Sequence, residues 1–115
     1  MRCRSGSNTS LRINSSAADE SFANSDGSGL FVANRSGASA TQCYRNGASF
    51  GSGTAAATTR PGGAGNLFVC AMNPNEANPS IRQQALAFFG GSLSADEIAA
   101  LYEAFASYLD AIGAI

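Results

Sequence analysis

Apolar side chains recur at steps of three and four residues near the end of the chain. They are Ile98, Leu101, Tyr102, Phe105, Leu109 and Ile112. This spacing predicts an amphipathic helix whose apolar face packs on the rest of its own domain. The charged positions of the helix are all acidic, which argues against a helix that lies on an anionic membrane surface.

Both ends of this helix carry sequence signals. Ser94 is followed three residues later by Glu97, the spacing of a capping box, in which each side chain accepts a hydrogen bond from the other residue's backbone N–H. We therefore expect the helix to begin near Ala95. Gly113 suits the C-terminal cap, where the backbone often turns into the left-handed conformation.

Upstream of the helix, short apolar runs alternate with turn residues, and no helical period is sustained. The candidate strands are residues 11–13, 30–34, 39–45, 48–51, 67–72 and 82–89. Residues 14–29 and 51–66 are rich in turn-forming residues and are predicted to be mainly loop. Asn46-Gly47 predicts a type I′ hairpin turn because both residues tolerate positive φ. The pattern indicates an antiparallel all-β body.

Composition and charge narrow the classes of partner. The chain has 115 residues, which is one small domain, residues 1–115. All seven basic residues are arginine, the net charge is −1, and only Arg2 and Arg4 lie close together, so nucleic acid is not the expected partner. We find no apolar segment long enough to span a membrane and no secretory signal at the N-terminus.

The sequence offers few residues for catalysis. The chain has no histidine, which excludes a Ser-His-acid triad and an imidazole base. Asp19 and Glu20 are adjacent and would face opposite sides of a strand, so they do not form a catalytic carboxylate pair. The segment Asp26-Gly27-Ser28-Gly29 has one acid and is interpreted as a turn rather than a calcium site. We expect no enzyme activity, no cofactor and no metal.

The cysteines do not indicate a disulfide framework or a metal site. Cys3, Cys43 and Cys70 are an odd set without a Cys-x-x-Cys spacing, so neither a disulfide scaffold nor a zinc site is indicated. Cys43 and Cys70 lie in apolar runs and are expected to be small buried hydrophobic residues. A single bridge between these two cysteines is the alternative.

Four segments in order carry a resemblance to a known family. They are Gly29-Leu30-Phe31-Val32-Ala33-Asn34-Arg35, Tyr44-Arg45-Asn46-Gly47, Leu67-Phe68-Val69, and the helix start from Gly91 to Tyr102. Together they resemble the C-terminal half of a laminin G-like, concanavalin A-like lectin domain, as in phage tail and bacterial surface proteins. The resemblance covers residues 28–115. It implies an antiparallel β-sandwich, a shortened jelly roll, with one C-terminal α-helix at its edge.

The function that this resemblance implies is a non-catalytic, lectin-like module for glycan adhesion. An exposed Tyr44 would stack on a sugar, while Arg35, Arg45 and Asn46 donate hydrogen bonds to this carbohydrate ligand. The alternative for Tyr44 is cross-strand packing within the sheet. Relatives often have acidic residues before the last strand, and residues 83–89 have none, which gives no support to a calcium site.

The short length leads to a second hypothesis. Half of a sandwich leaves strand edges and an apolar sheet face uncovered, which proteins usually avoid by capping or association. The chain is therefore expected to form a homo-oligomer or to contact neighbouring subunits, in a virion or cell-surface assembly. Its alternative function is purely structural, as an assembly domain or a truncated half-domain.

Overall fold

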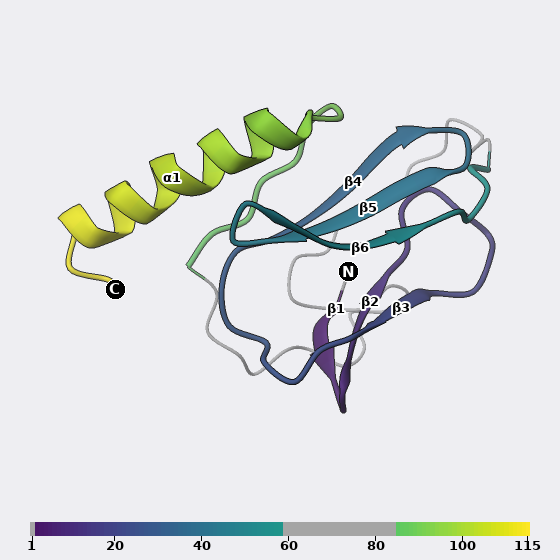
Figure 1. Ribbon diagram of the computed structural model, residues 1–115, viewed down its shortest axis with the longest axis horizontal. Helices are drawn as coiled ribbons and strands as arrows, with labels where there is room; N and C mark the ends of the chain where they lie inside the picture. The colour runs from purple at the N-terminus through teal and green to yellow at the C-terminus, as the bar shows by residue number, and fades with distance from the viewer. Residues whose placement is uncertain (1, 59–84) are drawn as a thin grey trace, which may run out of the picture. The chain divides into compact units, whose positions relative to one another are not determined.

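The computed structural model describes residues 2–58 and 85–115, with side chains from residue 6 onward (Figure 1). The strands are β1 (Arg2–Ser5), β2 (Asn8–Leu11), β3 (Glu20–Ala23), β4 (Phe31–Gly37), β5 (Ala40–Arg45) and β6 (Ala48–Gly53), and the helix is α1 (Ala95–Ala111). The chain divides into two units, Met1–Thr59 with Ser92–Ile115, and Arg60–Gly91. All of these strands and the helix belong to the first unit.

The strands form two small antiparallel sheets, ordered β1-β2-β3 and β4-β5-β6. Each strand pairs with the next one along the chain, so both sheets are meanders. The turn between β5 and β6 has φ of 51° at Asn46 and 79° at Gly47, which confirms the predicted left-handed pair. Beyond the turn, Arg45 pairs with Ala48 and Tyr44 with Ser49.

The prediction of an all-β, jelly-roll sandwich is wrong. The described residues form a mixed α/β fold, with short antiparallel strands in two small open sheets and one C-terminal helix. A jelly roll is built from eight strands in two Greek keys, whose connections cross between its sheets. In the described part of this chain each sheet is completed by sequential strands before the next sheet begins, and a 17-residue helix supplies a further layer.

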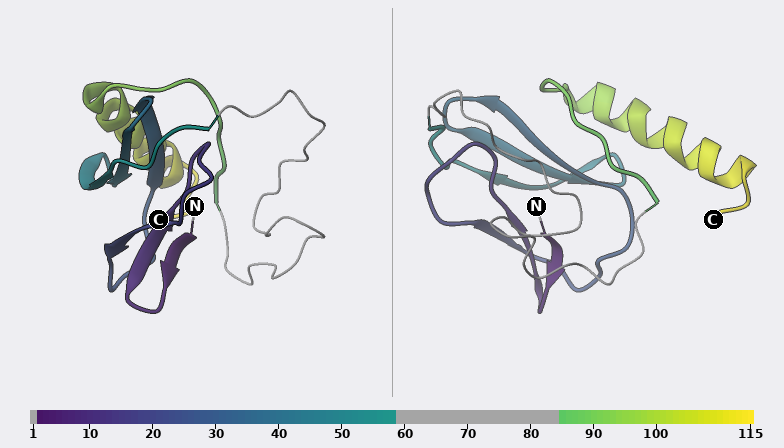
Figure 2. Two further views of the ribbon diagram at one scale, coloured as in Figure 1. Left: turned by 90° about the vertical axis from the view of Figure 1, so that its right-hand side faces the viewer. Right: turned by 180° about the vertical axis from the view of Figure 1, so that it is seen from behind.

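The β4-β5-β6 sheet has side chains packed against both of its faces because consecutive strand residues point to opposite sides. On one face, Phe31 and Cys43 form a buried cluster with Leu11 of β2. On the other face, Val32 and Tyr44 form a buried cluster with Ile98 of α1. The views of Figure 2 accordingly show α1 on the side of this sheet that faces away from β2 and β3.

The helix begins where its sequence signals predict. The Ser94 hydroxyl accepts from the backbone N–H of Glu97 at 3.3 Å, and the Glu97 carboxylate accepts from the backbone N–H of Ser94 at 2.7 Å. This is the predicted capping box, and it confirms a helix from Ala95. At the other end Ile112 caps the helix and Gly113 has a φ of 68°, the left-handed residue expected there.

The strand predictions had mixed outcomes. The strands expected at 30–34, 39–45 and 48–51 are found as β4, β5 and β6, but the segment 14–29, expected to be loop, contains β3. Residues 85–89 are not in a strand, so the last predicted strand is wrong over that part. The strand at 67–72 and the partner in a Cys43–Cys70 bridge lie outside the described residues.

Candidate functional site

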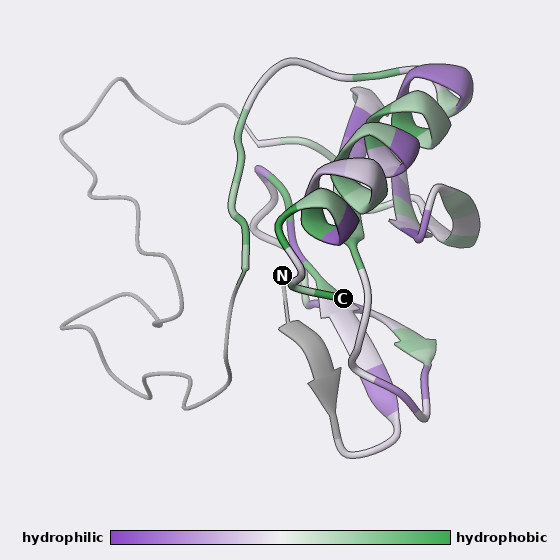
Figure 3. Ribbon diagram, turned by 90° about the vertical axis from the view of Figure 1, so that its left-hand side faces the viewer, coloured by the Kyte–Doolittle hydropathy of each residue, from purple (hydrophilic) through white to green (hydrophobic). Residues whose placement is uncertain are grey.

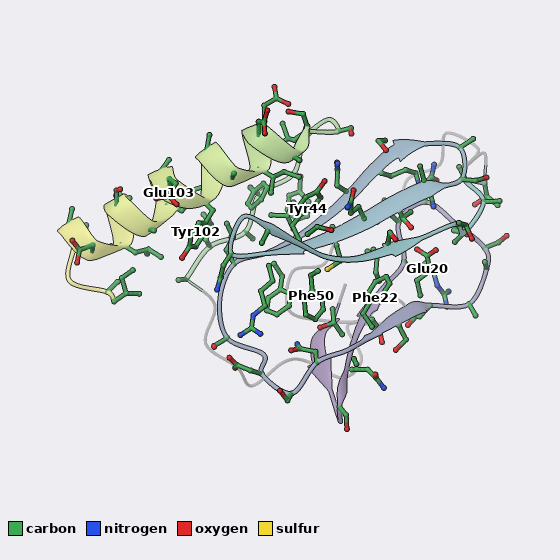
Figure 4. The ribbon with its side chains drawn as sticks, in the orientation of Figure 1. Glu20, Phe22, Tyr44, Phe50, Tyr102 and Glu103 are labelled. Carbon is green, nitrogen blue, oxygen red and sulfur yellow. The ribbon has the colours of Figure 1, made fainter. Side chains whose placement is uncertain are left out.

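The structure places Tyr44, the predicted sugar platform, beneath the helix. Its side chain is 5% exposed and packs with Val32 and Ile98, and its hydroxyl donates to the Gln42 Oε1 at 3.0 Å. Figure 4 shows the ring pointing from the sheet toward α1. Tyr44 therefore packs between sheet and helix, which is close to its alternative interpretation as a packing residue.

Arg35 uses its guanidinium within the fold. Its Nε donates to the carbonyl oxygen of Ile13 at 3.0 Å, and one Nη donates to the carbonyl of Ala55 at 2.8 Å. The other Nη donates to the carbonyls of Gly37 and Ala38 at 3.2 and 3.0 Å. Four carbonyl oxygens from three separate segments are thus held by one side chain, which makes Arg35 a connector between the sheets' loops.

Arg45 and Asn46 lie at the opposite end of the β4–β5 pair. The Nε of Arg45 donates to the carbonyl of Ser28 at 3.1 Å, its Nη pairs with the Asp26 carboxylate, and its guanidinium lies 5.6 Å from the centroid of the Phe31 ring. The Asn46 Oδ1 accepts from the backbone N–H of Leu30 at 2.9 Å. Both side chains fasten the hairpin to the segment that precedes β4.

The four predicted ligand residues do not converge on one point. Arg45 pairs with Phe31 at one end of the ladder and Arg35 pairs with Thr41 near the other end. Tyr44 points to the helix, so its ring is covered. A carbohydrate site at these residues stays a prediction, but the guanidinium groups of Arg35 and Arg45 and the hydroxyl of Tyr44 already donate hydrogen bonds within the chain.

A carboxylate to which the sequence pattern assigns no structural role joins the two sheets. Glu20 of β3 accepts hydrogen bonds from the Thr41 hydroxyl of β5 and, at 2.7 Å, from the backbone N–H of Ala55. A Cβ at Gly53 would overlap this carboxylate, so Glu20 fits only because residue 53 is glycine. Burial raises the pKa of Glu20, but the hydrogen bonds from Thr41 and Ala55 and the charge of Arg35 outweigh it, and the pKa is lowered from 4.5.

The sequence around Glu20 contains an alternating pattern typical of a strand, but the pattern is short. Glu20 and Phe22 alternate with Ser21 over four residues only, and Phe22 packs against the cluster between the sheets. Figure 4 shows Glu20 and Phe22 both on the side of β3 that faces the second sheet. Two inward side chains among many serines and alanines are too few to distinguish a strand from a loop.

The carboxylate of Asp26 is also held by contacts within the chain. Its carboxylate accepts from the backbone N–H and the hydroxyl of Ser28, each at 2.9 Å, and it pairs with Arg45. These hydrogen bonds lower the pKa of Asp26 from 3.8 to about 2. The turn interpretation of this segment is consistent with these contacts, in which the acid organises its own loop.

The far end of α1 presents apolar side chains to solvent. Ile98 in the first turns is completely buried, whereas Tyr108, Ile112 and Ile115 are 60%, 57% and 74% exposed. Figure 3 shows hydrophobic and hydrophilic residues along α1. We call Tyr108, Ile112 and Ile115 the C-terminal apolar surface. Of these three residues only Ile112 belongs to the apolar face predicted from the sequence, and the pattern does not distinguish it from the buried Ile98.

No group of three His, Cys, Asp or Glu side chains in the described ranges is arranged to hold a metal ion. None of the described helices has the length and hydropathy of a membrane span. In the second unit Leu86 and Phe89 are exposed, at 37% and 66%.

Comparison with known proteins identifies no relative of this chain. No protein-family model matches the sequence, and no curated protein and no solved structure is significantly similar to it. The comparisons therefore give no support to the laminin G-like resemblance.

Proposed function

We propose that this protein is a non-catalytic structural module that docks on a neighbouring subunit through the C-terminal apolar surface. The observation that carries the proposal is the contrast along α1, in which Ile98 is fully buried while Tyr108, Ile112 and Ile115 are more than half exposed. The anchored start holds the helix in place, and the exposed end offers the apolar contact.

The free energy of hydration favours covering this surface. Burying apolar area stabilises an interface by about 25 cal/mol per Å², and contiguous apolar patches on soluble proteins commonly mark interaction sites. Tyr108 and Ile112 are one helical turn apart and therefore lie on the same side of α1. A partner can contact both at once.

Glycan adhesion is the competing function, and the hydrogen bonds weigh against it. A sugar is recognised by polar donors and acceptors around a stacking ring, but the donors of Arg35 and Arg45 are bound to carbonyls and to Asp26. The ring of Tyr44 is covered by α1. To bind a sugar, these residues would have to give up contacts that hold the fold.

Two measurements on one set of variants test the proposal. Binding of the dye ANS, which reports exposed apolar surface, should fall in Tyr108→Ser/Ile112→Ser, while thermal unfolding is unchanged. Ala99→Ser is the matched control because it adds the same hydroxyl at an exposed position of α1, two and a half turns before Tyr108 and therefore on the opposite side of the helix. A glycan array should show no ligand for the wild-type chain.

Two results would contradict the proposed function. One is dye binding that the double substitution leaves unchanged, since the apolar surface would then not be accessible. The other is a specific glycan signal that Arg45→Ala abolishes, which would restore the adhesion hypothesis.

A further inference from the structure

We infer that Asn46 is a site of spontaneous deamidation, and that its conversion to isoaspartate loosens the contact between the β5–β6 turn and α1. The site consists of the Asn46 carboxamide, the backbone nitrogen of Gly47 and the backbone N–H of Leu30. This inference is independent of the proposed docking function, because it concerns the chemistry of the turn and not the C-terminal apolar surface.

Asn46 and Gly47 form the only Asn-Gly pair in the sequence. Deamidation of an asparagine begins when the backbone nitrogen of the next residue attacks the side-chain carbon Cγ. Glycine has no Cβ that would hinder this nitrogen. Both residues lie in the turn between the paired residues Arg45 and Ala48, and Asn46 is exposed. The nucleophile, the amide and the water that the reaction needs therefore meet in this turn.

The fold places a hydrogen-bond donor at the oxygen that becomes charged in this reaction. The backbone N–H of Leu30 donates to the Asn46 Oδ1 at 2.9 Å, and the Asn46 N–H donates to the Leu30 carbonyl at 2.9 Å. Attack on Cγ gives a tetrahedral intermediate whose negative charge lies on Oδ1, and a fixed donor at this oxygen stabilises the charge. A Cβ at Gly29 would overlap Oδ1, so this donor reaches the amide only because residue 29 is glycine.

Water is the only other reactant that the reaction consumes. The Gly47 nitrogen forms a bond to Cγ and gives its proton to water, and the bond from Cγ to Nδ2 breaks as Nδ2 takes up a proton and leaves as ammonia. The product is a succinimide ring. Water opens this ring by adding its hydroxyl to one of the two carbonyl carbons, and its proton returns to the Gly47 nitrogen. Opening at the main-chain carbonyl gives aspartate or isoaspartate according to which bond to nitrogen remains, and in isoaspartate the main chain runs through Cβ and Cγ and is one carbon atom longer.

The turn has little room for a longer main chain because it lies against α1. Gly47 has a φ of 79°, and a Cβ there would lie 3.3 Å from the Ala99 Cα and from two atoms of Tyr102. Figure 4 shows Tyr102 on the side of α1 that faces the hairpin. An added carbon atom at residue 46 displaces Gly47 from this close contact, since packed atoms leave no free space to absorb it. We therefore expect the first turns of α1 to be held less firmly in the isoaspartate form.

Asn14 provides a comparison site within the same chain. It is exposed and has a φ of 44°, close to the 51° of Asn46, so the two asparagines share the left-handed backbone conformation. Asn14 is followed by Ser15, whose side chain hinders the backbone nitrogen. We expect deamidation at Asn14 to be slower than at Asn46.

Incubation of the full chain in mildly alkaline buffer, which favours loss of the Gly47 proton, tests the site. Tandem mass spectrometry of its peptides should locate the mass gain of an amide converted to an acid at Asn46 before it appears at Asn14. Methylation by an isoaspartyl methyltransferase identifies the isoaspartate product. The same chain in urea gives the rate without the fold.

The effect on the helix is measured on the separated isoaspartate form. Its amides near Ala99 and Tyr102 should exchange hydrogen faster than those of the unmodified chain, and its unfolding temperature should be lower by about 4 °C or more, the shift that the loss of one hydrogen bond produces in a small domain. Asn46→Asp is the matched control, because it adds the same charge without a longer main chain. Hydrogen exchange of α1 in this variant should equal that of the wild type.

Three results would overturn the inference. A chain that is modified at Asn46 in urea but not when folded would show that the fold protects the turn. Equal rates at Asn46 and Asn14 would show that Gly47 does not promote the reaction. An isoaspartate form with unchanged exchange in α1 would show that the turn absorbs the longer main chain. None of these results bears on the docking function, whose test uses Tyr108 and Ile112.

Discussion

Single polar side chains hold segments of this protein that lie far apart in the sequence. Arg35 gathers carbonyl groups near residues 13, 37 and 55, and Glu20 links β3 to β5 and to the chain after β6. Among the described residues, each of the two apolar clusters has only three buried members, so these polar connectors contribute a large share of the contacts between segments. Substitution of Arg35 or Glu20 should therefore lower the free energy of unfolding by more than the partial exposure of these side chains suggests.

Glu20 makes the stability of the fold sensitive to acid. Because its folded-state pKa is lowered from 4.5, its stabilising effect is fully present above that value and is lost as the pH falls through the lower, folded-state pKa. In Glu20→Gln the free energy of unfolding should drop by about 1–3 kcal/mol at neutral pH. The decrease in the free energy of unfolding between neutral and acidic pH should also be smaller in this variant than in the wild type. Urea unfolding between neutral and acidic pH measures both effects.

Glu103→Gln is the matched control for this experiment. It removes the same charge from an exposed position of α1 and leaves Glu20 in place. The acid sensitivity of the control should equal that of the wild type. An identical pH profile in Glu20→Gln would mean that another group governs the acid response.

At the scale of elements, the start of α1 depends on its capping box. Ser94→Ala removes the hydroxyl that accepts from the Glu97 N–H, and we expect a loss of about 1 kcal/mol in the free energy of unfolding. Ser92→Ala is the control, because Ser92 is exposed and lies outside the box. Denaturant unfolding compares the two. Equal losses would show that the cap contributes nothing specific to this helix.

The elements that could be predicted from sequence are those set by neighbouring residues. The capping box spans Ser94 to Glu97 and the hairpin turn consists of Asn46 and Gly47, so a few side chains decide each. The strand β3 was not predicted because only its pairing with β2, whose residues lie 9 to 15 positions earlier in the chain, makes it a strand.

The candidate site was harder to predict because its contacts are distant in sequence. Tyr44 is covered by Ile98, and Arg35 bonds to Ile13 and Ala55, which lie about twenty residues to either side. A pattern of residue types along the chain carries no information about such partners. For the same reason the fold class was wrong, since the sequence pattern indicates strands without indicating how they are connected into sheets.

At the scale of the whole molecule, the two ends of α1 differ. The first turns pack on the β4-β5-β6 sheet through Ile98, whereas the last turns expose apolar side chains to solvent. Ile98→Ala should therefore reduce the free energy of unfolding by about 2–5 kcal/mol, the range for a large buried aliphatic side chain. Ile112→Ala, at a position that is 57% exposed, should change it by less than about 0.5 kcal/mol. Thermal or urea unfolding of both variants gives the comparison. Similar losses would mean that α1 is packed along its whole length.

The sequential order of the strands has a consequence for synthesis of the chain. The six strands of the described ranges lie within residues 2–53, whereas Ile98, which covers Val32 and Tyr44, is made 45 residues later. At about 5–20 residues per second, a ribosome takes about 2–9 s to reach it. During that interval the nascent β4-β5-β6 sheet keeps an apolar face without its helix, and this is the stage at which a chaperone would be needed most.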